Sequence, residues 1–245
     1  ESLMTKEIIR QKIQIPSVEH EIFKEENYGY IRINMFGETT ATEFRAALRE
    51  LEENIIDGLI IDVRNNGGGY LESAVEILSE FIEAWENLVS IRYRDSLLNT
   101  NFTSKNNWNI FNKKIVVLIN ENSASASEIT AWALKEYNKA LLIGKKSYWK
   151  WSVQEPFNIE GWSLLKLTVA NWYTPLWKNI ELEGISPDIE ISFLEEDYEN
   201  AYDRQLEEAK VLLEIFIEKN TPWLALDAYR TQFPTKLNIQ EWVTQ

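Results

Sequence analysis

The chain has 245 residues, of which 39 are acidic and 25 basic, so its formal net charge is −14. This charge repels phosphate and argues against nucleic-acid and anionic-membrane partners. The chain has no cysteine and a single histidine, His20, which excludes disulfides and cysteine nucleophiles and leaves little for histidine-based triads or metal sites. Any catalysis must then use Ser, Lys, Asp, Glu or Tyr.

Strands and helices are predicted in alternation by the spacing of apolar residues, and strands that alternate with helices favour an α/β fold with parallel pairing. No run of about 18 apolar residues occurs, so we expect no membrane-spanning helix, and the first residues lack the apolar core of a signal peptide. The expected elements, in chain order, are strands within 6–34, a helix at 40–54, a strand at 58–64, a glycine loop at 67–69, a helix at 70–84, strands at 114–120 and 140–144 on either side of a helix at 127–137, a strand at 164–170, and an acidic amphipathic helix at 195–219.

Three serines, Ser123, Ser125 and Ser127, follow the apolar strand at 114–120 and precede a helix. A strand-to-helix turn is where many enzymes present a nucleophile, because helix N-terminal N–H groups stabilise developing negative charge. Serine is also a common N-cap residue, so local sequence alone favours a structural cap over a nucleophile.

The glycine run at 67–69 and Lys150 are further candidates for catalytic groups. Glycine lets the backbone approach a reacting group closely, although a plain turn explains the run equally well, and no Gly-Lys-Ser/Thr follows to make it a phosphate loop. Lys150 lies in an aromatic stretch at 147–154. Burial there would lower the pKa of the lysine and make it a base, whereas an isolated lysine is typical of a surface.

Four blocks carry a resemblance to a known family: 59–69, 123–129, Lys150 with 152–154, and 184–189. Together, in this order and over about residues 8 to 191, they resemble the C-terminal processing (tail-specific) serine peptidases. The resemblance implies an α/β fold, a crotonase/ClpP-like β-α spiral. Residues 1–192 would be the peptidase core, and 193–245 an acidic helical C-terminal extension.

The resemblance also implies a Ser-Lys mechanism. Ser125 matches the nucleophile, Lys150 the general base, and Gln154 the residue that orients the base; the family spacing selects Ser125 over Ser123 and Ser127. A neutral lysine would take the proton of the serine hydroxyl, the serine would attack a peptide carbonyl, and water would hydrolyse the acyl-enzyme. No metal or cofactor is implied.

Backbone N–H groups would complete this site. The N–H of Ala126, with that of Gly68 or Gly69, matches the oxyanion hole, which stabilises the tetrahedral intermediate. Other polar residues match positions that support the catalytic groups. These are Glu128, Glu136 and Ser147.

The implied function is a serine endopeptidase that cleaves protein or peptide substrates near accessible C-termini, outside the cytoplasm in the periplasm or cell envelope. Most members carry a substrate-binding PDZ domain before the segment that matches 10–18, and residues 1–18 are expected to be the strand that leaves such a domain. Homo-oligomerisation stays open. The alternatives are a catalytically impaired peptide-binding or scaffold domain, and a crotonase-type acyl-thioester enzyme, which the spacing of Ser125, Lys150 and Gln154 disfavours.

Tryptophan is unusually common and glycine unusually rare, with ten Trp against nine Gly where glycine normally makes up about 7% of a chain. One hypothesis is that the gene comes from a lineage that decodes UGA as glycine, and that its UGA codons have been rendered as tryptophan. The alternative is a diverged peptidase that uses these aromatic residues in its core. Because two of them flank Lys150, we expect the polypeptide as written to be weakly active or inactive. The tryptophans at glycine positions of the family are Trp85, Trp132, Trp149, Trp151, Trp162 and Trp177.

Overall fold

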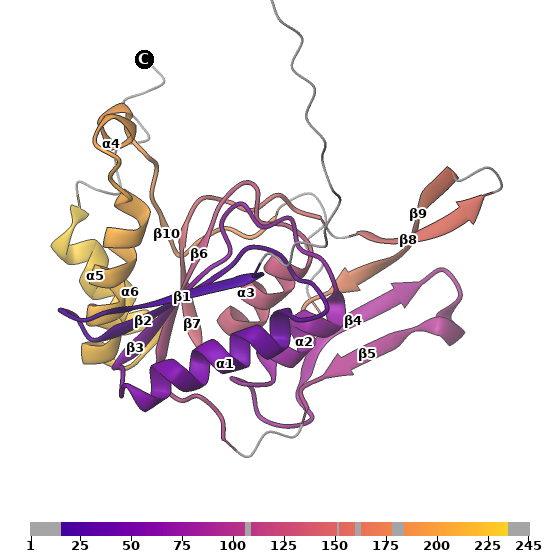
Figure 1. Ribbon diagram of the computed structural model, residues 1–245, viewed down its shortest axis with the longest axis horizontal. Helices are drawn as coiled ribbons and strands as arrows, with labels where there is room; N and C mark the ends of the chain where they lie inside the picture. Colours follow the sequence, from indigo (N-terminus) through magenta and orange to yellow (C-terminus); the bar gives the residue numbers. More distant parts are fainter. Residues whose placement is uncertain (1–15, 106–108, 151, 160–162, 178–183, 235–245) are drawn as a thin grey trace, which may run out of the picture.

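A six-stranded sheet forms the centre of the computed structural model (Figure 1), which describes residues 16–105, 109–150, 152–159, 163–177 and 184–234. The strand order is β1-β2-β3-β6-β7-β10. The first pair is antiparallel and all other neighbours are parallel. The strands are β1 (Val18–Phe23), β2 (Tyr28–Ile33), β3 (Gly58–Asp62), β6 (Lys114–Ile119), β7 (Ala140–Gly144) and β10 (Ile189–Glu190).

Helices cover both faces of this sheet (Figure 1). In β3, the side chains of Leu59 and Ile61 join one apolar cluster and that of Ile60 joins the other, because successive strand residues point to opposite faces. Burial on both faces explains the continuous apolar run in the sequence. The first cluster includes residues of α1 (Thr40–Glu53), α2 (Leu71–Leu78) and α3 (Ala126–Glu136), and the second includes residues of α5 (Arg204–Lys219) and α6 (Pro222–Gln232).

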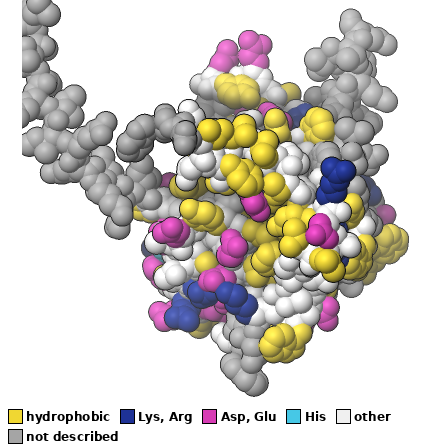
Figure 2. Space-filling view, turned by 90° about the vertical axis from the view of Figure 1, so that its right-hand side faces the viewer, with side chains coloured by type: hydrophobic (Ala, Val, Ile, Leu, Met, Phe, Trp, Pro, Cys, Tyr) yellow, Lys and Arg dark blue, Asp and Glu magenta, His cyan; other side chains and the backbone are white. Residues whose placement is uncertain are grey.

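A second sheet of four antiparallel strands lies beside the first (Figure 1). Its order is β5 (Thr100–Thr103), β4 (Asn87–Tyr93), β9 (Ser163–Tyr173) and β8 (Ser152–Ile159). Hydrophobic side chains occupy much of the molecular face on this side (Figure 2). Large exposed apolar side chains of β8 and β9 are Phe157, Ile159, Leu164, Leu165 and Leu167.

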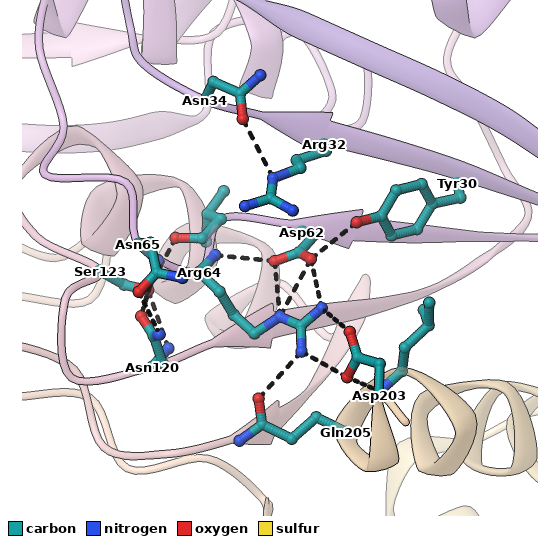
Figure 3. Close-up of polar contacts among 12 residues, drawn as sticks. Tyr30, Arg32, Asn34, Asp62, Arg64, Asn65, Asn120, Ser123, Asp203 and Gln205 are labelled. Atoms are coloured by element: carbon teal, nitrogen blue, oxygen red, sulfur yellow. Dashed lines mark hydrogen bonds and ion pairs between the residues drawn. The ribbon is translucent and has the colours of Figure 1, made fainter. Parts of the chain in front are cut away.

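A buried polar network joins the end of β3 to the start of α5 (Figure 3). The guanidinium of Arg64 donates to the carboxylate of Asp62 and, at 2.7 Å, to that of Asp203. It also donates to Gln205 Oε1, while the hydroxyl of Tyr30 donates to Asp62 at 2.8 Å. Burial, followed by the charge of Asp62, raises the pKa of Tyr30. The network therefore links residues about 140 positions apart in the chain.

The expected α/β fold with a helical C-terminal part is confirmed, with differences in the elements. The helix predicted at 70–84 ends at Leu78. The helix predicted at 195–219 is two helices, α4 (Glu195–Glu199) and α5, and α6 follows where the sequence indicated no element. The strand expected around residues 13–15 lies outside the described residues. Within the described part of the chain, none of the helices is both long and apolar enough to cross a membrane.

Candidate active site

Ser125 lies in the turn between β6 and α3, at the N-cap of the helix. Its φ of 57° and ψ of −116° are uncommon for a residue with a side chain and are found at functional sites. The two neighbouring serines differ from it, because their hydroxyls are buried and donate to backbone carbonyls: Ser123 to Val63 and Ser127 to Asn66, each at 2.8 Å. Ser125 is half-buried. The structure thus distinguishes Ser125 from the other two independently of family spacing.

A pocket of about 350 Å³ brings the predicted catalytic residues together. It collects residues of the glycine loop after β3, the start of α3, the segment before β8, and strands β4, β8 and β9. Its lining residues are Gly67, Gly68, Gly69, Leu71, Ile91, Ser125, Ile129, Lys150, Ser152, Val153, Gln154 and Trp172.

Glu128 connects the turn that carries Ser125 to the segment that carries Lys150. Its side chain is fully buried in the first turn of α3. One carboxylate oxygen accepts the backbone N–H groups of Ser125 and Lys150, both at 2.9 Å. The other oxygen accepts the Ser147 hydroxyl at 2.5 Å and the backbone N–H of Trp149 at 2.7 Å. Four donors on one buried carboxylate fix the two segments relative to each other.

Lys150 is half-buried and its backbone is held from a second side. The buried indole of Trp172, on β9, donates its Nε1–H to the Lys150 carbonyl at 2.7 Å. Gln154 is exposed on β8, at a shift of register with β9 between Val153 and Gln154. Such a bulge redirects side chains, and Gln154 lines the pocket that Lys150 also lines.

The glycine loop lies against the serine turn. Gly68 has φ +94°, and a Cβ there would lie 2.7 Å from Ser125 Cβ and 2.9 Å from the nitrogen of Ala126. Only glycine fits such an approach. The N–H of Gly68 donates to Asn66 Oδ1 at 2.9 Å. Gly69 pairs with Phe36 in a parallel bridge, whose hydrogen bonds join the Phe36 N–H to the Gly68 carbonyl and the Tyr70 N–H to the Phe36 carbonyl. The N–H of Gly69 therefore points away from Phe36.

Asn66 is a structural link that the sequence reasoning did not single out. Its fully buried amide donates to the Ile33 carbonyl at 2.7 Å and accepts the N–H of Gly68. Its backbone carbonyl accepts the N–H of Ala124 at 3.0 Å and the hydroxyl of Ser127. Asn66 therefore joins β2, the glycine loop and the serine turn. The sequence signal was a side-chain amide directly before the glycine run that follows a buried strand.

The supporting residues suggested by the sequence fall in two places. Ser147 is buried beside Glu128 and also accepts the N–H of Ile185 at 2.8 Å. Glu136 lies at the other end of α3, about 16 Å along the helix axis from Ser125 at 1.5 Å per residue. There it accepts the N–H of Leu176 at 2.9 Å, so it contacts the turn after β9 and not the pocket.

No candidate metal site occurs among the described residues, because no group of three or more His, Asp or Glu side chains there is placed to hold an ion. The polar side chains at the pocket are the hydroxyls of Ser125 and Ser152, the amine of Lys150 and the amide of Gln154, beside the N-terminus of α3. These groups suit acyl transfer, in which a nucleophile, a base and oxyanion donors must converge.

Comparison with known proteins gives a consistent result. The family model described as Peptidase family S41 matches residues 27–191. The chain is 40% identical over 180 residues to the carboxy-terminal processing protease CtpB of Bacillus subtilis, covering 74% of this chain and 37% of that protein. It is 35% identical over 209 residues to a carboxy-terminal-processing protease of Bartonella bacilliformis, covering 83% and 47%.

Solved structures show the same likeness. A photosystem II D1 C-terminal processing protease matches with a TM-score of 0.65 and 28% identity, over 83% of this chain and 54% of that one. The chain spans less than half the length of the two curated relatives named above. The extent of the family match and the identity to these relatives show that the chain belongs to peptidase family S41.

Proposed function

We propose that the chain is the catalytic core of a C-terminal processing protease that hydrolyses peptide bonds through an acyl-enzyme on Ser125. The observation that carries this proposal is the pocket that both Ser125 and Lys150 line, with the backbone N–H groups of both residues bound to Glu128. Family membership supports the reaction class. The names of the relatives support cleavage near protein C-termini, and the family resemblance is the basis on which we propose an extracytoplasmic location.

In the proposed reaction, the neutral amine of Lys150 takes the proton of the Ser125 hydroxyl as its oxygen attacks the substrate carbonyl. The same proton then goes to the leaving amine as the peptide bond breaks. A water molecule, deprotonated by Lys150, then attacks the resulting ester; the bond to the Ser125 oxygen breaks, the acid leaves, and Lys150 returns the proton to that oxygen. Gln154 lines the same pocket, and we assign it the orientation of the lysine amine.

The oxyanion of the tetrahedral intermediate needs two N–H donors. Ala126 is the first residue of α3, so its N–H has no acceptor within the helix and carries the positive end of the helix dipole. Of the two loop glycines, Gly68 already donates to Asn66, which favours Gly69 as the second donor. Each donor is worth about 3 kcal/mol of transition-state stabilisation.

An extended substrate has a backbone edge to bind. Among the described residues, β8 pairs with β9 on one side and ends the order of its sheet. Its first residues, Ser152 and Val153, line the pocket, and its later residues Phe157 and Ile159 are exposed. An edge strand offers unpaired N–H and carbonyl groups to a peptide. We propose that the substrate pairs with this edge and places its scissile bond at Ser125.

A serine-reactive phosphonate probe tests the nucleophile. Labelling is expected for the chain, is expected to be absent in Ser125→Ala, and is expected to fall at least about a hundredfold in Lys150→Ala. Ser186→Ala and Lys146→Ala are the matched controls, since both residues are exposed and outside this pocket, and they should label normally. Labelling of Ser125→Ala at the normal rate, with the fold intact by circular dichroism, would remove Ser125 from the mechanism.

A second candidate function is an impaired peptidase that binds peptides without cleaving them. It is favoured by the backbone of Trp149, which has φ +72° directly before the proposed base. This candidate predicts binding of an unfolded protein's C-terminal peptide in a fluorescence anisotropy assay, with no probe labelling and no cleavage. Cleavage of the same peptide that Ser125→Ala abolishes would exclude it.

A further inference from the structure

Three tryptophans have a backbone conformation that normally belongs to glycine. The φ angles are 73° at Trp85, 72° at Trp149 and 65° at Trp177. Residues with a side chain rarely adopt positive φ, and when they do, asparagine and aspartate are enriched while bulky residues are outliers. The other non-glycine residues with positive φ follow this rule in part, since four of them are asparagines. These four are Asn27, Asn65, Asn138 and Asn220.

The conformation separates the tryptophans into classes. Trp172 and Trp223 stand at positions where the family resemblance suggests no glycine, and neither has positive φ. Trp132 is suspected from the sequence, but it is helical within α3 and its backbone makes no demand for glycine. The remaining suspected positions, 151 and 162, lie outside the described residues. All suspected tryptophans of the described loops thus have glycine-like φ angles.

The three rings are largely exposed, so burial of the rings does little to offset the strain of positive φ. Trp85, Trp149 and Trp177 are 74%, 46% and 55% exposed, whereas a tryptophan normally stabilises a protein by burying its large ring. Trp172 shows the contrast, at 2% exposure and with its indole N–H donating to Lys150. One compensating contact exists, because the guanidinium of Arg92 lies 4.5 Å from the centre of the Trp177 ring.

Backbone contacts, and not the rings, hold these conformations. The N–H of Trp85 donates to the Ser104 carbonyl at 3.1 Å, and that of Trp177 to the Thr174 carbonyl at 3.0 Å. The N–H of Trp149 donates to Glu128 at 2.7 Å. A glycine makes the same three hydrogen bonds without a Cβ in the left-handed region. Glycine therefore fits the backbone conformation of these three turns better than tryptophan does.

We propose that positions 85, 149 and 177 are glycine positions of this protein, specified by UGA codons that its source organism reads as glycine. Position 149 bears on the reaction, because it directly precedes Lys150 and its N–H binds the same carboxylate as the N–H of Lys150. A tryptophan there strains the segment that carries the proposed base. Glycine at 149 relaxes that segment while keeping the hydrogen bond.

Thermal unfolding tests the backbone part of the proposal. Trp85→Gly and Trp223→Gly form a matched pair, since their rings are 74% and 71% exposed but only position 85 has positive φ. Trp85→Gly and Trp149→Gly should each raise the melting temperature by about 2–4 °C, the shift that relief of about 1 kcal/mol produces in a chain of this size. Trp177→Gly should raise it less, because the Arg92 contact is lost. Trp223→Gly, in a helix, should lower it.

Equal lowering of the melting temperature in Trp85→Gly, Trp149→Gly and Trp223→Gly overturns the assignment of glycine positions. The gene itself tests the codons. UGA is expected at 85, 149 and 177, and UGG at 172 and 223. UGG at the first three positions overturns the recoding.

Both measurements are independent of catalysis, so this inference and the proposed function can fail separately. A third readout connects them. Probe labelling of Trp149→Gly should be at least about tenfold faster than that of the chain as printed, and Ser125→Ala should abolish it in both backgrounds. A raised melting temperature without labelling in any variant would support the glycine positions and contradict the peptidase.

Discussion

The Glu128 carboxylate accepts the backbone N–H of Lys150 at 2.9 Å, although the two residues are 22 positions apart in the chain. The same oxygen accepts the N–H of Ser125. One buried side chain on α3 therefore sets the position of the proposed nucleophile and of the proposed base together. If these two residues form the catalytic pair, their geometry depends on a carboxylate that binds the backbone N–H of each.

Glu128→Gln should reduce both stability and activity. Each carboxylate oxygen of Glu128 accepts two donors, and the NH₂ group of glutamine must replace one of these oxygens. Two buried donors then have no acceptor, at a cost of about 1–3 kcal/mol each. We expect the free energy of unfolding to fall by about 2–4 kcal/mol in urea titrations, and kcat to fall at least about tenfold with little change in KM. Glu121→Gln, at an exposed turn position, is the control. Full kcat in Glu128→Gln would contradict the positioning role.

Trp172→Phe should slow the reaction while keeping the core filled. Phenylalanine retains an aromatic ring at this 2%-exposed position but has no N–H for the Lys150 carbonyl. We expect kcat to fall about three- to tenfold and the free energy of unfolding to fall by about 1–2 kcal/mol. Trp223→Phe, at an exposed position, should change neither. An unchanged kcat in Trp172→Phe would show that this bond does not set the position of Lys150.

Asn66→Asp should destabilise the protein, because it replaces the N–H₂ group that donates to the Ile33 carbonyl by a second oxygen. Two acceptors then face each other in a fully buried site, at a cost of about 2–4 kcal/mol. Asn54→Asp is the matched control, since its amide also donates to a backbone carbonyl at 2.8 Å but is exposed. Its effect should stay below about 1 kcal/mol. Equal effects of both substitutions in urea unfolding would argue against the role of burial.

Asp203→Asn should change the pH dependence of stability. Burial raises the pKa of Asp203, but the hydrogen bonds and charge of Arg64 outweigh it and lower the pKa below the ordinary 3.8. The folded state therefore binds fewer protons than the unfolded state, so this stabilisation is complete above about pH 5 and is lost as the pH falls through the folded pKa. Asparagine still caps α5 through Leu206, since both residues are good N-caps.

The stability difference between the original chain and Asp203→Asn should accordingly be about 1 kcal/mol at pH 7, a small value because the side chain is 39% exposed. It should shrink as the pH falls below the ordinary pKa of 3.8 and vanish only below the lowered pKa of the folded state. Urea unfolding at a series of pH values measures this difference. The same difference at every pH would show that the charge of Asp203 does not act through Arg64.

The central sheet could be predicted from the sequence because strands buried on both faces are continuous apolar runs, as at 58–62 and 114–119. The second sheet was predicted only in part, by the strand at 164–170 that corresponds to β9. Its strand β8 is half-buried or exposed along its whole length, so no alternation of polar and apolar residues marks it. The break between α4 and α5 was also missed, because the acidic amphipathic pattern continues through Asp203, which caps the new helix.

The candidate site divides in the same way. Ser125 and Lys150 could be proposed from the sequence because serine and lysine can act as a nucleophile and a base and because both lie in blocks that resemble the family. The importance of Asn66 and Trp172 arises from contacts with Ile33 and with Lys150, 33 and 22 positions away in the chain. No local pattern reports such contacts. The sequence does not choose between Gly68 and Gly69 as the second proposed oxyanion donor. The hydrogen bond from the Gly68 N–H to Asn66 favours Gly69.

Helix α5 covers one face of the central sheet, so a truncated form of this protein that lacks α5 would expose that face. The family match ends at residue 191, but Leu212, Leu213 and Phe216 of α5 share a buried cluster with Ile60 and Val116 of the sheet. A polypeptide shortened to the matched segment would present a bare apolar sheet to water and would be expected to aggregate. The smallest unit that folds is therefore longer than the segment by which the family is recognised.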